Sequence, residues 1–389
     1  MPADLATYRA YIAAFNITDS KAAFDSGYYV PLPDSLSARI RARAEIQPGA
    51  IQAIVGGIGF GKTTQLLAAA AALRESSDLE PRYVDVASTH KLSVLKPSLL
   101  LTLAGLELAA LVPAEESYER ASKKIRGHGF GRWVARGEED EPPDDDNWDV
   151  WASGLLQDPN RIAPDIAGIE ADVGLLLSGL KKHLVLLFDG LDRVQDLVAL
   201  ITMLSQDLRA FKRLSIGCVL ALPEQMLFGK ERSFLDKLDW HPLTAFDVQH
   251  DPKAKDLFSE VLARRAPSGL LTDAAIELLI KSSGGVFRDL IVLARSAGEE
   301  AYMAGASTID LQYVTHAADR FGRKRLIGLN KEQIEALKRV RKTGAFVETS
   351  DSDVSLLATG SVLQYARPNS RFEVHPTLVP LLRSLERAA

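Results

Sequence analysis

One stretch of the chain decides its fold, AIQAIVGGIGFGKTTQLLAAA at residues 50–70. Its first six residues, Ala50–Val55, form a short apolar run that predicts a buried strand. The alanine- and leucine-rich run Thr64–Ala70 predicts a helix. Between the two lies a glycine-rich loop that ends in Lys62 and Thr63. This order of strand, loop and helix indicates an α/β fold.

The same order is the context that a phosphate-binding loop, or P-loop, requires. Glycines let backbone N–H groups surround a β-phosphate because no Cβ intervenes, and the helix N-terminus adds partial positive charge. Lys62 is predicted to reach the β- and γ-phosphates, and the Thr63 hydroxyl to ligate Mg²⁺. We therefore expect a bound nucleoside triphosphate, held by Gly56, Gly57, Ile58, Gly59, Phe60, Gly61, Lys62, Thr63 and Thr64.

The composition excludes several classes of protein. The 389 residues are 47% hydrophobic and 25% charged, which is typical of a soluble protein of two or three domains. A net charge of −5 argues against a broadly basic surface that coats nucleic acid. The single cysteine, Cys218, allows no internal disulfide and favours the cytoplasm. Charges interrupt the N-terminal sequence, and Glu107 interrupts the longest apolar segment, Leu99–Val112, so we expect neither a signal peptide nor a membrane span.

The expected domains follow from changes in pattern along the chain. Residues 1–48 are predicted to form a helical leader, and residues 49–240 a P-loop core in which strands alternate with helices around a mainly parallel sheet. The strands expected after the first are Pro81–Ala87, His183–Phe188 and Ser215–Leu222. Residues 113–164 interrupt this pattern, and their acidic stretch Glu138–Asp146 predicts a mobile loop.

Helical periodicity replaces the alternation after Pro242. Residues 241–329 are expected to form a helical lid, with helices at Pro252–Arg265, Thr272–Ser282, Phe287–Met303 and Ile309–Phe321. In residues 330–389 the expected elements are helices at Lys331–Lys342, Asp353–Ala358 and Pro376–Glu386 and a hairpin of Ser361–Ala366 and Arg371–Val374. Helices with a terminal hairpin in so short a segment predict a winged-helix domain.

A P-loop also needs a carboxylate at the tip of a neighbouring strand to hold Mg²⁺ through water. Asp189 ends the apolar run Leu184–Phe188 and is predicted to be this catalytic, metal-binding residue. Asp192 is a candidate base or water-orienting group. The alternative is that Asp192 caps a helix expected to begin near Val194.

A P-loop core followed by a lid and a winged helix resembles the AAA+ superfamily, and within it the origin-recognition-like and STAND (signal-transduction NTPase) branches. The segment Asp189–Arg193 resembles the STAND form of the Walker B motif. Gly284–Leu290 resembles the sensor-2 motif of the lid, in which an arginine, here Arg288, approaches the γ-phosphate. Arg371–Leu378 resembles the winged-helix segment of NLR-type proteins, in which a histidine, here His375, lies against ADP. The resemblance implies an ATPase that uses ATP, ADP and Mg²⁺.

The chain departs from the family pattern in ways that predict slow hydrolysis. Gly190 stands where many AAA+ enzymes have a catalytic Glu. The strand that ends at Leu222 has no polar residue at its tip, and Pro376 replaces the Asp of the His-Asp pair. A site that binds nucleotide well and turns it over slowly suits a switch better than a motor.

A purely structural role is the alternative for two of the site residues. Arg288 could form a surface salt bridge with Asp289 or Glu299, and His375 could be a core residue of the winged helix. The expected recognition helix, Asp351–Ala358, is acidic, which argues against sequence-specific DNA recognition.

The resemblance leaves two functional classes open. The first is a STAND-like regulatory ATPase that changes shape or forms a homo-oligomer on binding ATP and controls a partner protein, in bacterial defence or signalling. The second is an origin-recognition-like or transposon-type ATPase that assembles on DNA without strong sequence preference.

Overall fold

The structure, a computed structural model, describes residues 4–16, 20–32, 35–93, 95–130, 166–347, 351–366 and 370–388. The chain divides into two compact units. The sheet unit consists of Leu36–Val55 and Gln65–His241, and the lid unit of Met1–Ser35, Gly56–Thr64 and Pro242–Ala389. The glycine-rich loop therefore groups with the lid and not with the strand that precedes it.

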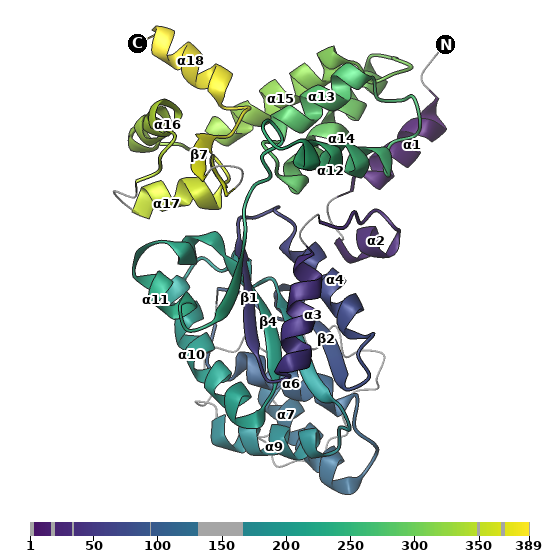
Figure 1. The fold of residues 1–389 in the computed structure, drawn as a ribbon, viewed down its shortest axis with the longest axis vertical. Coiled ribbons are helices and arrows are strands. Elements are labelled where there is room, and N and C mark those ends of the chain that lie inside the picture. Colours follow the sequence, from purple (N-terminus) through teal and green to yellow (C-terminus); the bar gives the residue numbers. More distant parts are fainter. Residues whose placement is uncertain are drawn as a thin grey trace. The chain divides into compact units, whose positions relative to one another are not determined.

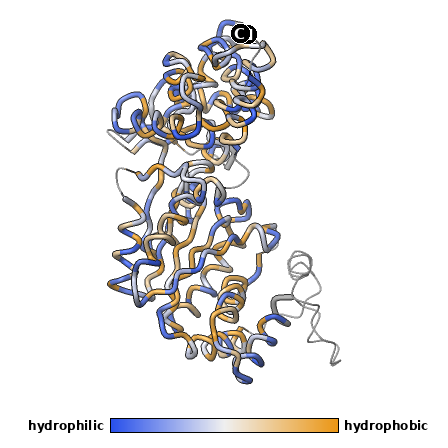
Figure 2. The backbone as a smooth tube through the Cα atoms, turned by 90° about the vertical axis from the view of Figure 1, so that its right-hand side faces the viewer, coloured by the Kyte–Doolittle hydropathy of each residue, from blue (hydrophilic) through white to orange (hydrophobic). Residues whose placement is uncertain are grey.

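A five-stranded parallel sheet, in the order β2-β3-β4-β1-β5, forms the centre of the sheet unit (Figure 1). Its strands are β1 (Ile51–Gly56), β2 (Leu79–Asp85), β3 (His183–Asp189), β4 (Gly217–Pro223) and β5 (Asp239–Leu243). Every residue of β1 and β4 is buried, and hydrophobic stretches follow the strands in Figure 2. Burial on both faces explains why these strands are continuous apolar runs. The α/β fold predicted from the sequence is confirmed.

Helices and short 3₁₀ turns complete this unit. They are α3 (Leu36–Ile46), α4 (Lys62–Leu73, begun in the lid unit), α5 (Val86–Thr89), α6 (Leu99–Ala109), α7 (Glu116–Phe130), α9 (Ile166–Ser178), α10 (Leu197–Leu214) and α11 (Arg232–Leu235), with 3₁₀ turns η2 (Leu191–Arg193), η3 (Glu224–Leu227) and η4 (Gly229–Glu231). Helix α6 packs against α7, α9 and α10, and their apolar side chains join those of the sheet in one core.

Two expectations for the sheet unit need correction. The interruption at residues 113–164 begins as helix α7, whose Ala121 and Ile125 are buried in the core. A Cβ at Gly105 of α6 would lie only 2.8 Å from Ile125, so the two helices are in close contact. The acidic stretch Glu138–Asp146 lies outside the described residues. Strand β5 was not expected, because Pro242 interrupts its sequence; a proline is tolerated there since β5 is an edge strand.

In its described residues, the lid unit consists of helices, their connections and one antiparallel hairpin. Its elements are α1 (Leu5–Ala14), α2 (Ser20–Asp25), α12 (Pro252–Ala263), α13 (Asp273–Ser282), α14 (Phe287–Met303), α15 (Leu311–Leu326), α16 (Lys331–Thr343), α17 (Asp351–Ala358), β6 (Val362–Tyr365), β7 (Arg371–Val374) and α18 (Val379–Ala388). Helix α1 packs on α14, where the Tyr11 hydroxyl donates a hydrogen bond to the Ala294 carbonyl at 2.8 Å. No helix of the described ranges is long and apolar enough to cross a membrane.

The winged-helix elements, α16 to α18 with the β6–β7 hairpin, are joined to the lid by backbone contacts. Ala245 N–H donates to the Gln364 carbonyl at 3.1 Å, and the Tyr365 hydroxyl donates to the Gly284 carbonyl at 2.9 Å. The last helix begins at Val379 and not at Pro376, because residues 375–378 form a turn in which Leu378 N–H donates to the His375 carbonyl at 2.9 Å.

Candidate functional site

At two positions the glycine-rich loop has a backbone conformation that favours glycine. Gly59 and Gly61 have φ of +89° and +99°, in the left-handed region. A Cβ on Gly59 would lie 2.6 Å from the Arg288 Cβ. The close approach of α14 and the positive φ therefore both require these glycines.

Lys62, the first residue of α4, is turned back onto this loop. Its Nζ donates to the carbonyl oxygens of Gly56 and Gly57 at 2.6 and 2.7 Å, and only 4% of the residue is exposed. A buried ammonium beside a helix N-terminus, which carries partial positive charge itself, favours an anion at this place. Thr63 and Thr64 follow, both partly exposed. The residues of the loop fit a phosphate group.

The start of α14 lies against the loop. The N–H of Arg288 donates to the Gly59 carbonyl at 3.2 Å, which satisfies one of the N–H groups that a helix leaves unpaired at its first turn. Neither acid considered as a surface partner for Arg288 takes that role in the described residues: Asp289 pairs with Arg325 at 2.6 Å and Glu299 with Arg295 at 3.1 Å. The structure therefore brings Arg288 to the loop.

His375 occupies a different place from the one predicted. It is fully buried, and its Nδ1 accepts from the N–H of Thr377 at 3.3 Å and lies 2.8 Å from the Thr377 hydroxyl. Its Nε2 lies 3.2 Å from the Asp289 carboxylate. Burial lowers the pKa of His375, which favours the neutral ring. Both ring nitrogens face protein groups, and not the glycine-rich loop as expected.

In the sheet unit, Asp189 ends β3 as predicted and is buried. One of its carboxylate oxygens accepts from the N–H of Gly190 and the other from the Tyr83 hydroxyl, both at 2.8 Å. Burial raises the pKa of Tyr83, so its hydroxyl stays a donor. The strand of Asp189 does not adjoin β1 as expected, because β4 lies between them.

Two residues at this strand tip were missed in the sequence. Tyr83 and Asp85 belong to β2, and the parallel register places Asp85 opposite Asp189. The Asp85 carboxylate accepts from the N–H of Ala87 at 3.0 Å and ends the strand by capping α5. The apolar run that predicts β2 carries no signal of this register, which only the paired strands reveal.

The residues that follow Asp189 explain a departure noted in the sequence. Gly190 has a φ of +84°, and a Cβ there would lie 2.8 Å from the Ala87 Cβ, so a glutamate does not fit. Asp192 lies in η2, half-buried. Its capping alternative is wrong, because α10 begins at Leu197 and its cap is Asp196, which accepts from the Ala199 N–H at 2.9 Å.

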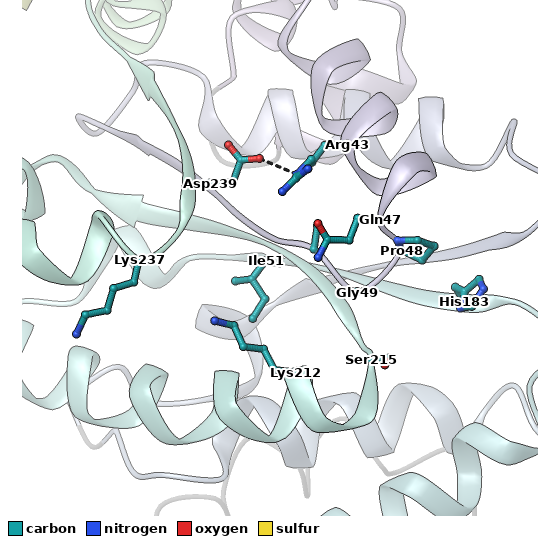
Figure 3. Close-up of a pocket in the computed structure, with 11 residues that line it drawn as sticks. Arg43, Gln47, Pro48, Gly49, Ile51, His183, Lys212, Ser215, Lys237 and Asp239 are labelled. Carbon is teal, nitrogen blue, oxygen red and sulfur yellow. Dashed lines mark ion pairs between the residues drawn. The ribbon is translucent and has the colours of Figure 1, made fainter.

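A separate pocket of about 550 Å³ lies at the opposite edge of the sheet (Figure 3). Its lining includes the first residues of β1, β3 and β5, which are Ile51, His183 and Asp239. Arg43 is paired with Asp239 at 3.0 Å, and Lys212 and Lys237 line the same pocket (Figure 3). Ligands of parallel sheets bind at the carboxyl ends of strands, so this pocket is not the expected phosphate site.

Comparison with protein-family models and with curated proteins gives no match. Among solved structures, the chain is similar to the ORC1 protein of Aeropyrum pernix in complex with DNA, at 13% identity over 97% of this chain and 98% of that one, with a TM-score of 0.48. It is similar to Cdc6p from Pyrobaculum aerophilum, at 12% identity over 96% and 98%, with a TM-score of 0.44. It is also similar to the RuvB Holliday junction branch migration motor of Thermotoga maritima, at 14% identity over 89% and 92%, with a TM-score of 0.40. Likeness at this level carries no conclusion about activity or partners.

Proposed function

We propose that the chain binds ATP through residues 56–64 and hydrolyses it slowly, as a P-loop ATPase. The observation that carries this proposal is the loop itself, in which two left-handed glycines precede a buried lysine at the first position of α4. Such a backbone exposes N–H groups without an intervening Cβ, while Lys62 and the helix N-terminus supply positive charge. The β- and γ-phosphates of a nucleoside triphosphate are the ligand that this combination suits.

Thr63 and Asp189 are the residues proposed to hold Mg²⁺, which would neutralise charge on the β- and γ-phosphates. Support comes from sheet topology, because β1 and β3 are parallel and end at the same edge. The Asp189 oxygens each keep a lone pair beside the hydrogen bonds from Gly190 and Tyr83, so they can still accept from metal-bound water.

Slow turnover is proposed because no glutamate can follow Asp189. The left-handed conformation of Gly190 and its contact with Ala87 exclude a side chain at that position. Asp192, on the next turn, is the proposed water-orienting group, and Arg288 the proposed γ-phosphate contact. Loss of a well-placed general base lowers the rate of hydrolysis by a factor of about 10²–10⁴.

Slow hydrolysis favours a STAND-like regulatory switch that controls a partner protein through a change of shape or through self-association. Three basic residues of α16 that could contact DNA are engaged within the chain. Lys338 pairs with Glu335 and Arg341 with Glu386, both at 2.7 Å, and Arg339 lies 3.7 Å from Asp353. These pairs leave less charge for phosphate contacts, so assembly on DNA is the second candidate.

Substitution of Lys62 tests the nucleotide site. Lys62→Ala removes the point charge proposed to meet the phosphates and is expected to lower ATP affinity at least tenfold, measured by calorimetry. Lys212→Ala is the matched control, since Lys212 is exposed and lies at the opposite edge of the sheet. A folded Lys62→Ala protein with the affinity of the wild type contradicts the proposal.

A further inference from the structure

The lid unit contains a buried ionic cluster of Asp289, Arg325 and His375. They come from α14, from α15 and from the turn after β7. The Arg325 Nη2 donates to Asp289 Oδ2 at 2.6 Å, and the His375 Nε2 lies 3.2 Å from the same oxygen. The side chains of Asp289, Arg325 and His375 are 7%, 16% and 0% exposed. The 3.2 Å approach of the His375 Nε2 lacks hydrogen-bond geometry, so among the described residues the Asp289 carboxylate is bonded to Arg325 and lies beside the His375 ring.

The neutral imidazole of His375 is oriented by Thr377. A backbone N–H can only donate, so the Nδ1 that faces the Thr377 N–H must be the accepting nitrogen. The ring proton is then on Nε2, which faces Asp289. The cluster thus holds one negative and one positive charge and presents a neutral N–H from the winged helix to the lid.

Asp289 connects this cluster to the glycine-rich loop through a single helical turn. Phe287, Arg288 and Asp289 are the first three residues of α14, and Val286 before them provides no side-chain cap. The Arg288 N–H is bonded to the Gly59 carbonyl at 3.2 Å, and a carboxylate at the third position is favoured by the helix dipole. The same turn therefore contacts the loop on one side and the cluster on the other.

The segment just before this turn is held by the winged helix. A Cβ on Gly284 would lie 2.5 Å from Leu363 and 2.9 Å from Pro376, so the approach is tight. The Tyr365 hydroxyl also donates to the Gly284 carbonyl at 2.9 Å. The start of α14 cannot shift without disturbing the packing of the hairpin.

We propose that Asp289 is a positioning residue: bonded to Arg325 and packed beside the His375 ring, it fixes the first turn of α14 on the glycine-rich loop and couples nucleotide binding to docking of the winged helix. His375 acts on the site through Asp289 and contacts no phosphate. The inference rests on the nucleotide site proposed above. Because coupling between two sites is reciprocal, bound nucleotide also stabilises the docked position of the winged helix and slows amide hydrogen exchange in its hairpin.

The test compares His375→Ala with His375→Gln. His375→Ala removes the ring whose Nε2 lies 3.2 Å from the Asp289 carboxylate, and it is expected to weaken the binding of ATP and of ADP about fivefold to twentyfold. His375→Gln keeps an N–H donor at the same distance along the side chain, so affinity is restored. In the wild type, ATP with Mg²⁺ is expected to slow amide hydrogen exchange in β6 and β7. In His375→Ala this slowing is expected to be absent.

Arg371→Gln is the matched control. Arg371 joins the same hairpin to the lid through Asp247 at 2.6 Å, without contact to Asp289, so its loss is expected to leave nucleotide affinity within twofold. The double variant Asp289→Asn with Arg325→Gln removes both buried charges together, and it serves where His375→Ala does not fold. It is expected to show the same loss of affinity.

The outcomes separate the two proposals. Wild-type affinity in folded His375→Ala and in the double variant overturns the positioning role alone. An equal loss in Arg371→Gln also overturns it, because the effect then comes from docking in general. Absence of nucleotide binding by the wild type overturns the proposed function, and the coupling with it.

Discussion

At the scale of single residues, Gly190 shows how one backbone conformation limits chemistry. Its φ of +84° and its contact with Ala87 leave no space for the side chain that a fast ATPase would place there. The neighbouring carboxylate of Asp189 is instead fixed by two donors, Gly190 N–H and the Tyr83 hydroxyl. The strand tip therefore holds one carboxylate in a fixed position and has no second carboxylate directly after it.

Gly190→Ala is expected to destabilise the protein by about 2–4 kcal/mol, because it adds the left-handed penalty of about 1–2 kcal/mol to a steric overlap. Gly305→Ala is the control, since Gly305 also has a positive φ of +67° but nothing lies within 4 Å of its Cβ position. The control substitution is expected to lower the free energy of unfolding only by the left-handed backbone penalty of about 1–2 kcal/mol. Urea unfolding of both variants measures the difference, and equal losses would show that the overlap with Ala87 is relieved.

At the scale of elements, helix α6 is capped by a residue of another helix. Ser98 before it has a φ of +77° and gives no side-chain cap. The Asp207 carboxylate of α10 accepts instead from the N–H groups of Ser98 and Leu100, at 2.6 and 2.8 Å. Asp207 is fully buried, and burial raises its pKa to about 7 although the N–H donors favour the charged form.

This cap predicts a pH dependence of stability. Because the pKa of about 7 in the folded state lies above the ordinary aspartate value of 3.8, the folded state binds the proton more tightly than the unfolded state. The stabilisation is complete below about pH 4 and is lost as the pH rises through 7. The free energy of unfolding of the wild type is therefore expected to fall relative to that of Asp207→Asn between pH 4 and pH 8. Parallel curves for the two proteins would contradict the raised pKa.

The elements that the sequence predicts correctly are those with a local signal. The run Leu184–Phe188 and the helix Phe287–Met303 follow from apolar periodicity, and the structure has both. Strand β5 was missed because Pro242 breaks its pattern and only its place at the sheet edge makes that proline acceptable. The Asp207 cap and the Tyr83 contact join residues more than 100 positions apart, and no local pattern carries such information.

The residues of the candidate site also fall into those with a local sequence signal and those whose contacts depend on the tertiary structure. The loop residues through Lys62 are recognised by spacing alone, since the motif needs those residue types in that order. The direction of His375 depends on which side chains surround it, and Asp289 and Thr377 were not visible as its partners from the sequence. The sequence motif singles out His375 as a candidate site residue. The tertiary packing determines which groups its ring nitrogens face.

At the scale of the whole molecule, the glycine-rich loop belongs to the same compact unit as the lid and the winged helix. The strand tip with Asp189 belongs to the sheet unit. The two groups of residues that the sequence predicts for one site, the loop and Asp189, therefore lie in different compact units.

This division leads to a prediction about assembly. The wild type is expected to sediment as a larger species with ATP and Mg²⁺ than with ADP, without any DNA, because the contact proposed between Arg288 and the γ-phosphate cannot form with ADP. Lys62→Ala is expected to keep the ADP-like sedimentation in both nucleotides.

If instead ATP produces no self-association but retains the protein on DNA, the second candidate function is correct. In that case the logarithm of the affinity falls with the logarithm of salt concentration by about 0.9 for each phosphate contacted, and Lys324→Ala on the basic last turn of α15 would reduce that slope by roughly one contact.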